Sequence, residues 1–113
     1  MEIIKRELFD KYDVLDVIGI LELNYKIESN IFYEDESNVS IKFLLNDNKS
    51  FLMRFKNVNS LQLKYFGGSF NQLLGFVIIE NPTYEKNLRY HIKDYENSII
   101  DFYCESYEII TNV

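Results

Sequence analysis

His91 is the only histidine of the sequence and the residue best suited to acid–base chemistry, with Asp101 as its expected partner. A carboxylate that hydrogen-bonds an imidazole can hold it as a general base, provided that a nucleophile or a substrate pocket lies nearby. No second histidine and no phosphate-binding glycine loop completes such a site. We therefore interpret His91 and Asp101 as a structural cross-strand pair and expect no catalytic residue.

Cys104 is the only cysteine, so it cannot form an internal disulfide, and this agrees with a reducing compartment. It shares an expected apolar strand face with Ile100 and Phe102, which predicts a buried and inert thiol. One cysteine and one histidine on opposite faces cannot supply a tetrahedral zinc site. The run Glu34-Asp35-Glu36 lacks the alternating ligands and the glycine of a calcium loop, which favours a solvated turn. We expect no metal and no cofactor.

The charge balance argues against two classes of ligand. Eighteen acidic and twelve basic residues give a net charge of −6, and this field repels phosphate backbones and anionic lipid head groups. The same field favours a basic protein partner. No run approaches about 18 apolar residues, and the first residues lack the pattern of a signal peptide. These features predict a cytoplasmic protein with neither nucleic acid nor membrane as its partner.

Nine tyrosines in 113 residues are a second pointer to protein binding, because tyrosine is enriched at interfaces. Several of them fall in or near an acidic hairpin at the C-terminal end. A surface of tyrosines and carboxylates suits a basic partner, although the same rings would equally serve half-buried sheet packing. The candidate partner-binding residues are Asp94, Tyr95, Glu96, Asp101, Tyr103, Glu105, Tyr107 and Glu108.

This hairpin is expected over residues 88 to 110, because its two arms agree in their alternation of apolar and polar side chains. A five-residue loop, residues 94 to 98, would place Lys93 opposite Ile99. The resulting pairs are Ile92 with Ile100, Tyr90 with Phe102 and Leu88 with Cys104 on the apolar face, and His91 with Asp101 on the other face.

The rest of the chain is expected to be mostly strand. Apolar residues three or four apart predict a short amphipathic helix over about residues 3 to 17. Alternation predicts a half-buried strand over 21 to 27, a second hairpin over 39 to 57, and a strand over 61 to 65. The run from 73 to 79 is apolar on both faces, which is typical of a central strand.

Successive strands lie close together without the crossover helices that a parallel sheet requires. The sequence therefore predicts a mainly β fold that borders on α+β. We expect an antiparallel, sandwich-like or roll-like arrangement of about seven strands with one short N-terminal helix. The chain has 113 residues, of which 47% are hydrophobic, and this is enough for one core. We therefore expect residues 1–113 to form a single globular domain.

Four segments carry a resemblance to a known class of proteins. They are Phe55-x-Asn57-Val58-x-x-Leu61-x-Leu63, Gly75-Phe76-x-Ile78, Tyr90-His91-Ile92-x-Asp94-Tyr95-Glu96 and Ile100-x-Phe102-x-Cys104-Glu105. Over about the C-terminal two thirds, the chain resembles small β-rich immunity-type proteins of the polymorphic toxin systems of Gram-positive bacteria. The resemblance rests on core-strand residues. It implies a cytoplasmic, non-enzymatic protein that binds and blocks a cognate toxin domain, and it transfers no binding residues.

Three functions follow as hypotheses of decreasing weight. The first is an immunity protein that occludes a basic toxin domain through the acidic, tyrosine-bearing hairpin. The second is a small-ligand-binding sandwich or barrel with an aromatic-lined pocket, which would contain an enclosed cavity of roughly 300 Å³ or more. The third is an enzyme that uses His91 and Asp101 in a cleft. Self-association is a further arrangement that the sequence leaves open.

Overall fold

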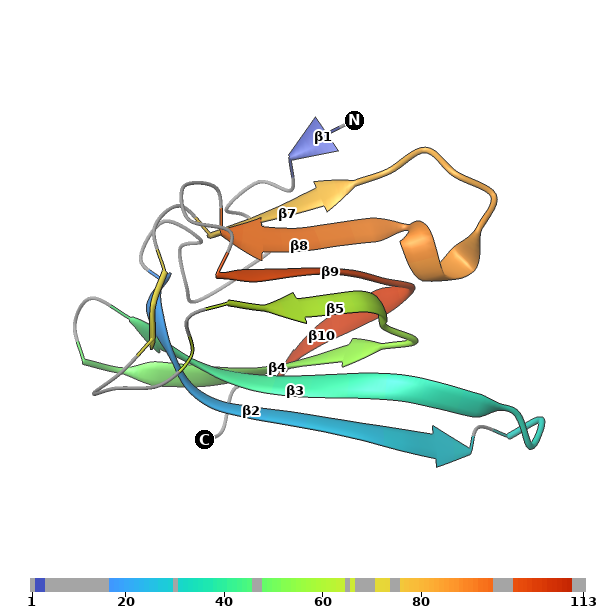
Figure 1. Cartoon of the computed structure of the whole chain (residues 1–113), viewed down its shortest axis with the longest axis horizontal. Coiled ribbons are helices and arrows are strands. Elements are labelled where there is room, and N and C mark those ends of the chain that lie inside the picture. The colour runs from blue at the N-terminus through green and yellow to red at the C-terminus, as the bar shows by residue number, and fades with distance from the viewer. Residues whose placement is uncertain are drawn as a thin grey trace.

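The computed structural model describes residues 2–3, 17–29, 31–45, 48–64, 66, 71–73, 76–94 and 99–110. Within these ranges the chain is almost entirely β-strand (Figure 1). The strands are β1 (Glu2–Ile3), β2 (Val17–Ser29), β3 (Asp35–Leu45), β4 (Ser50–Lys56), β5 (Asn59–Leu63), β6 (Asn71–Gln72), β7 (Phe76–Glu80), β8 (Tyr90–Asp94), β9 (Ile100–Cys104) and β10 (Ser106–Ile110). The 3₁₀ helix η3 (Lys86–Leu88) precedes β8.

The described strands form two five-stranded antiparallel sheets. The order in the first sheet is β1-β7-β8-β9-β5, and the order in the second sheet is β10-β4-β3-β2-β6. This arrangement confirms the prediction of a mainly β, antiparallel fold. Three described strands exceed the expected seven. Two of them, β1 and β6, have only two residues each, and the third, β10, was predicted as a continuation of β9.

The two sheets pack face to face around a shared apolar core, as in a sandwich. The ring centroids of Phe43 and Phe76, from opposite sheets, lie 4.8 Å apart. Phe55 and Phe102 meet edge to face across the same layer at 5.0 Å. The residues predicted to face the interior do so: Ile41, Phe43, Met53, Phe55, Ile92, Ile100 and Phe102 are buried, and Tyr90 is partly buried.

The C-terminal hairpin has the predicted faces but a different register. The observed pairs are Tyr90 with Cys104, His91 with Tyr103, Ile92 with Phe102 and Lys93 with Asp101. Strand β8 continues through Asp94, whose Oδ1 accepts hydrogen bonds from the backbone N–H groups of Ile99 and Ile100. This carboxylate closes the loop one residue later than predicted. A slip of two residues keeps each side chain on its face, so the apolar face was predicted correctly although the register was wrong.

The second arm of that hairpin does not continue to residue 110, which is a further correction. Beyond Cys104 its partner segment would be residues 84 to 89, where η3 interrupts the extended backbone. The chain therefore turns at Glu105, whose N–H donates to the Lys56 carbonyl at 3.0 Å, and β10 pairs with the edge of β4. Strand β4 ends at Lys56, and the next residue, Asn57, has φ of 54°, a conformation that asparagine tolerates.

Strands β2 and β3 form a long hairpin that runs past the strands of the first sheet (Figure 1). The strand predicted over 21 to 27 is confirmed, but its burial is not. Leu21, Tyr25 and Ile27 are 46%, 48% and 62% exposed. Alternation identifies the two faces of a strand, whereas burial also requires an opposing layer. Leu21 lies at the register shift between Ile20 and Glu22, and the end of the hairpin projects past the strands of the first sheet (Figure 1).

The helix expected over about residues 3 to 17 falls mostly outside the described residues. Its two end positions, Ile3 and Val17, belong to β1 and β2 instead. Residue 65 and the turn residues 95 to 98 also lie outside the described part of the chain. Within that part, no helix has the length and apolar character needed to span a membrane.

Candidate functional site

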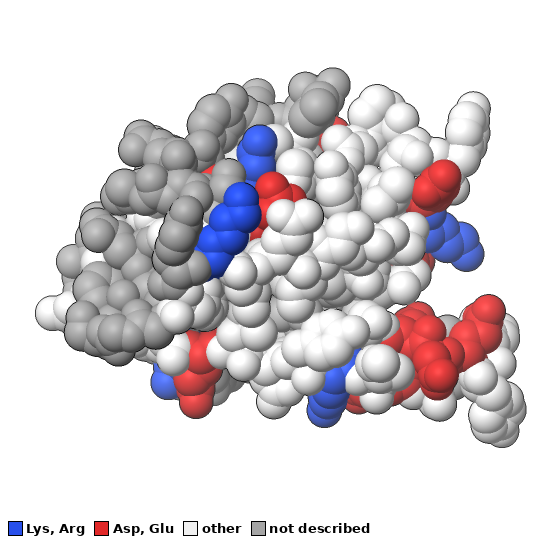
Figure 2. Space-filling model, in the orientation of Figure 1, with Lys and Arg blue, Asp and Glu red and all other residues white. Residues whose placement is uncertain are grey.

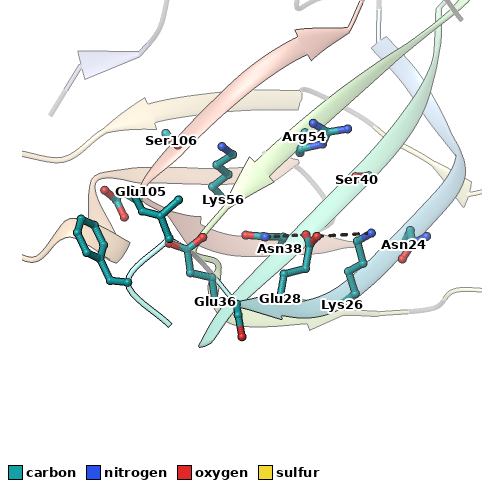
Figure 3. Close-up of a pocket in the computed structure, with 13 residues that line it drawn as sticks. Asn24, Lys26, Glu28, Glu36, Asn38, Ser40, Arg54, Lys56, Glu105 and Ser106 are labelled. Atoms are coloured by element: carbon teal, nitrogen blue, oxygen red, sulfur yellow. Dashed lines mark hydrogen bonds and ion pairs between the residues drawn. The ribbon is translucent and has the colours of Figure 1, made fainter. Parts of the chain in front are cut away.

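An open groove with a volume of about 780 Å³ lies on the outer face of the second sheet (Figure 3). It crosses β2, β3 and β4. The connection between β2 and β3 bounds one end, and the corner between β9 and β10 bounds another. Its lining residues are Asn24, Lys26, Glu28, Ser29, Ile31, Phe32, Glu36, Asn38, Ser40, Arg54, Lys56, Glu105 and Ser106.

A chain of hydrogen bonds connects the groove to the corner where the chain changes sheets. Asn38 is buried, and its Nδ2 donates to Glu28 Oε1 at 2.8 Å. Its Oδ1 accepts from the backbone N–H of Asn57 at 3.1 Å. Asn57 Nδ2 donates in turn to Glu105 Oε1 at 3.2 Å. Two amides thus hold two carboxylates of the groove at defined positions on the sheet.

The charges of the groove are mixed rather than acidic. Its basic residues are Lys26, Arg54 and Lys56, and its acidic residues are Glu28, Glu36 and Glu105. The hydrogen bond from Asn38 lowers the pKa of Glu28, and the charge of Lys26, whose Nζ lies 3.7 Å from Oε2, acts in the same direction. Arg54 Nη1 lies 3.1 Å from Glu108 Oε1 on β10. Such a lining suits the mixed polar groups of a polypeptide better than a polyanion.

The most exposed apolar side chains next to the groove belong to the hairpin tip, which we define as residues 31 to 36. Ile31, Phe32 and Tyr33 are 85%, 72% and 92% exposed. Tyr33 has φ of 61°, a region that bulky residues rarely adopt. Glu34 and Asp35 follow directly and are exposed, and Figure 2 shows acidic side chains gathered at this end of the molecule. The tip therefore combines apolar rings with carboxylates on a projecting hairpin.

His91 and Asp101 come together on the outer face of the first sheet, on the opposite side of the sandwich from the groove. His91 Nε2 lies 2.7 Å from Asp101 Oδ1, and the imidazole stacks on the Tyr103 ring at 4.2 Å. Because of the register, this contact is diagonal and the residue directly opposite His91 is Tyr103. The groove residues do not include this pair. The geometry is that of a packed cross-strand contact.

The candidate binding residues of the C-terminal hairpin are not gathered on one surface. Asp94 is buried and closes the loop, while Asp101 and Tyr103 lie on the outer face of the first sheet. Tyr95 and Glu96 lie outside the described residues. The change of sheet at residue 105 separates the remaining candidates from these, so the hairpin does not form the continuous acidic and aromatic face that its sequence suggests.

The three candidates beyond that corner also diverge. Glu105 lines the groove, and Glu108 pairs with Arg54 on the outer face of the second sheet. Tyr107 points toward the core and meets the Tyr90 ring edge to face at 5.1 Å. Burial raises the pKa of Tyr107 to about 12. Tyr107 is therefore a packing residue, and Glu105 is the member of the predicted set that belongs to the groove.

Cys104 is buried, as predicted. Burial, with a smaller contribution from the charge of Glu105, raises the pKa of the thiol to about 12. A thiol with a pKa raised in this way holds almost no thiolate at neutral pH, so we continue to predict that Cys104 is inert.

Sequence reasoning missed the hairpin tip. A signal was present, because three large apolar residues, Ile31-Phe32-Tyr33, directly precede the run Glu34-Asp35-Glu36 that was predicted to be a solvated turn. Apolar side chains in a turn have little opportunity for burial, which marks them as exposed. The polar groove carried no comparable signal, because its residues come from strands far apart in the sequence.

Within the described part of the chain, no three His, Cys, Asp or Glu side chains gather in a way that could hold a metal ion. Comparisons of the chain with protein families, with curated proteins and with solved structures found no match.

Proposed function

We propose that this is a cytoplasmic, non-enzymatic binding protein that uses its hairpin tip to occlude a basic protein partner, a cognate toxin domain. The observation that carries the proposal is the exposure of Ile31, Phe32 and Tyr33 on a hairpin that projects from the sandwich. Exposed aromatic residues that enter a partner's pocket supply most of the binding energy at many interfaces. Phe32 and Tyr33, with the aliphatic Ile31 directly before them, form a compact anchor.

The charge around the tip supports a basic partner. Glu34 and Asp35 adjoin the anchor, and the chain carries a net charge of −6. Complementary charge speeds the encounter of two proteins and fixes their orientation. A toxin domain that acts on nucleic acid needs a basic surface to neutralise phosphates, and an acidic plug fits that surface.

The groove extends the same binding surface. Ile31 and Phe32 line one end of it, so a partner loop that contacts the tip could continue across the polar floor toward Glu105. The backbone of Tyr33 adds support, because a positive φ at a bulky residue costs of the order of 1 kcal/mol. Strain of this kind persists at sites where the conformation serves a function.

Two observations favour binding over the alternatives. The interior aromatic rings, such as Phe43 and Phe51 at 5.5 Å, pack against one another, which leaves less support for a ligand pocket lined by them. His91 is engaged by Asp101 and stacked on Tyr103, which is a structural arrangement rather than an open catalytic one. The resemblance to immunity-type proteins agrees with a protein partner.

The test is binding kinetics against the toxin-like protein encoded beside this gene. Replacing Phe32 by Ala should raise the off-rate and weaken binding by about 2 kcal/mol, roughly 30-fold. Tyr33→Gly should weaken binding while leaving the fold as stable or more stable, because glycine adopts positive φ without strain. Tyr84→Ala is the matched control, since Tyr84 is a fully exposed tyrosine in the segment before η3. Wild-type protein that does not bind, or a Phe32→Ala variant that binds like the control, would refute the proposal.

A further inference from the structure

No described strand pairs with the outer edge of β2 from Leu21 to Ser29, and we call this stretch the open edge. Among the described strands, β6 is the neighbour on this side, and it pairs only with Gly19 and Ile20. The side chains along the open stretch are exposed on both faces, apart from Leu23, which is partly buried. An open edge presents backbone donors and acceptors that can pair with a further strand.

This edge lacks most of the features that prevent an exposed sheet edge from pairing with a strand of another molecule. Proteins protect such edges with prolines, bulges and charged side chains, above all lysine. The two register shifts in β2 lie between Val17 and Gly19 and between Ile20 and Glu22, before most of the open stretch. The stretch contains no proline, and its one lysine, Lys26, lies 3.7 Å from the carboxylate of Glu28. The edge is therefore competent to accept a strand.

We propose that the strand it accepts is β2 of a second copy, paired antiparallel about a two-fold axis at Asn24. This register places Glu22 opposite Lys26 of the second copy, and Leu23 opposite its Tyr25. Each pair occurs twice, because the contact is symmetric. Two ion pairs then lie on the groove face, and two aliphatic–aromatic pairs lie on the other face, both of which favour strand pairing.

The charges decide between this register and its neighbours. The apolar faces of the two β2 strands lie on the same side of the combined sheet only when the two-fold axis passes through a residue. An axis at Tyr25 would oppose Glu22 to Glu28, and an axis at Lys26 would oppose that lysine to its own copy. Like charges directly opposite each other destabilise a sheet. An axis at Leu23 would set Glu22 against Asn24 and form no ion pair, so the Asn24 register is the complementary one.

The axis at Asn24 directs the two hairpin tips away from each other. The pairing extends from Leu21 to Ile27 of each copy, because β6 already pairs with Gly19 and Ile20. The second sheets of the two copies become one continuous sheet. This inference does not depend on the proposed function, because it rests on the edge of β2 and not on the tip.

Sedimentation velocity over a concentration series tests the dimer through its charges. Wild-type protein should show a concentration-dependent dimer. Glu22→Lys should remove it by opposing two lysines across the axis, and Lys26→Glu should remove it by opposing two glutamates. An equimolar mixture of the two variants should dimerise again, because each facing pair is then a lysine and a glutamate. Lys86→Glu, a charge reversal at an exposed position on η3, is the control and should dimerise like wild type.

Cross-linking tests the register. Asn24→Cys places two thiols directly opposite each other, within the Cα separation that a disulfide allows. Ser29→Cys is the control, because this exposed position lies far from the axis. Cys104 is buried and does not compete. Mild oxidation should link Asn24→Cys quickly and Ser29→Cys slowly or not at all. A wild type that stays monomeric, a mixture that does not dimerise, or equal linking of the two cysteine variants would overturn the inference.

Discussion

Asp94→Ala should destabilise the fold more than any other loss of a single polar side chain in the C-terminal hairpin. Asp94 is buried, and its Oδ1 accepts the backbone N–H groups of Ile99 and Ile100. Alanine removes the acceptor from one buried donor, the Ile100 N–H, and from one partly buried donor, the Ile99 N–H. A buried donor left without an acceptor costs about 1–3 kcal/mol. Because the loop relaxes and water reaches part of it, we expect a total loss of about 3 kcal/mol, a large share of the roughly 5–15 kcal/mol that stabilises a domain.

Urea unfolding followed by circular dichroism measures this loss. With a slope of roughly 1–3 kcal/mol per molar urea, the midpoint should fall by roughly 1–3 M. Asp94→Asn is the matched variant, because its amide oxygen can still accept both N–H groups, and it should lose less than half as much. An Asp94→Ala midpoint close to wild type, or an Asp94→Asn midpoint as low as that of Asp94→Ala, would refute the reasoning that hydrogen bonds to Asp94 Oδ1 stabilise the hairpin and fix its register.

Three further predictions concern the core and the groove. Since burial raises the pKa values of Cys104 and Tyr107 to about 12, the unfolded chain loses these protons at lower pH than the folded chain. The free energy of unfolding should therefore fall as the pH rises from 9 toward 12, and less steeply in Cys104→Ala; an equal slope in both proteins would contradict the shift at the thiol. At pH 8 a thiol reagent should label native Cys104 about 1000-fold more slowly than the unfolded chain, and comparable rates would contradict its burial. Arg54→Ala should change the unfolding free energy by less than about 1 kcal/mol, because the pair with Glu108 is exposed, and a larger loss would show that the groove charges stabilise the fold.

Short-range patterns in the sequence were sufficient to predict the strand faces. In residues 39 to 45 and 51 to 55 every second residue is apolar, and a strand points alternate side chains to opposite faces wherever it is placed. The faces of β3, β4, β8 and β9 therefore followed from local sequence. The burial of Cys104 followed for the same reason, since it shares a face with Phe102.

Register and strand partners depended on the tertiary structure. A two-residue slip preserves both faces, so alternation could not distinguish Phe102 from Ile100 as the residue opposite Ile92, and the Asp94 carboxylate decided it. The transfer of residues 106 to 110 to the second sheet depended on the available edge of β4 and on η3, which occupies the segment that would have paired with them.

The candidate site depended on the tertiary structure for a further reason. Leu21 and Ile27 alternate like buried residues, but both are exposed. Leu21 lies at the register shift between Ile20 and Glu22, and Ile27 lies near the end of β2, where the hairpin runs past the strands of the first sheet (Figure 1). The groove brings Asn24, Arg54 and Ser106 onto one face, although they belong to three strands separated along the chain. Local sequence determines which way a side chain points from its own strand. Only the pairing and stacking of distant strands decide what covers it and what lies beside it.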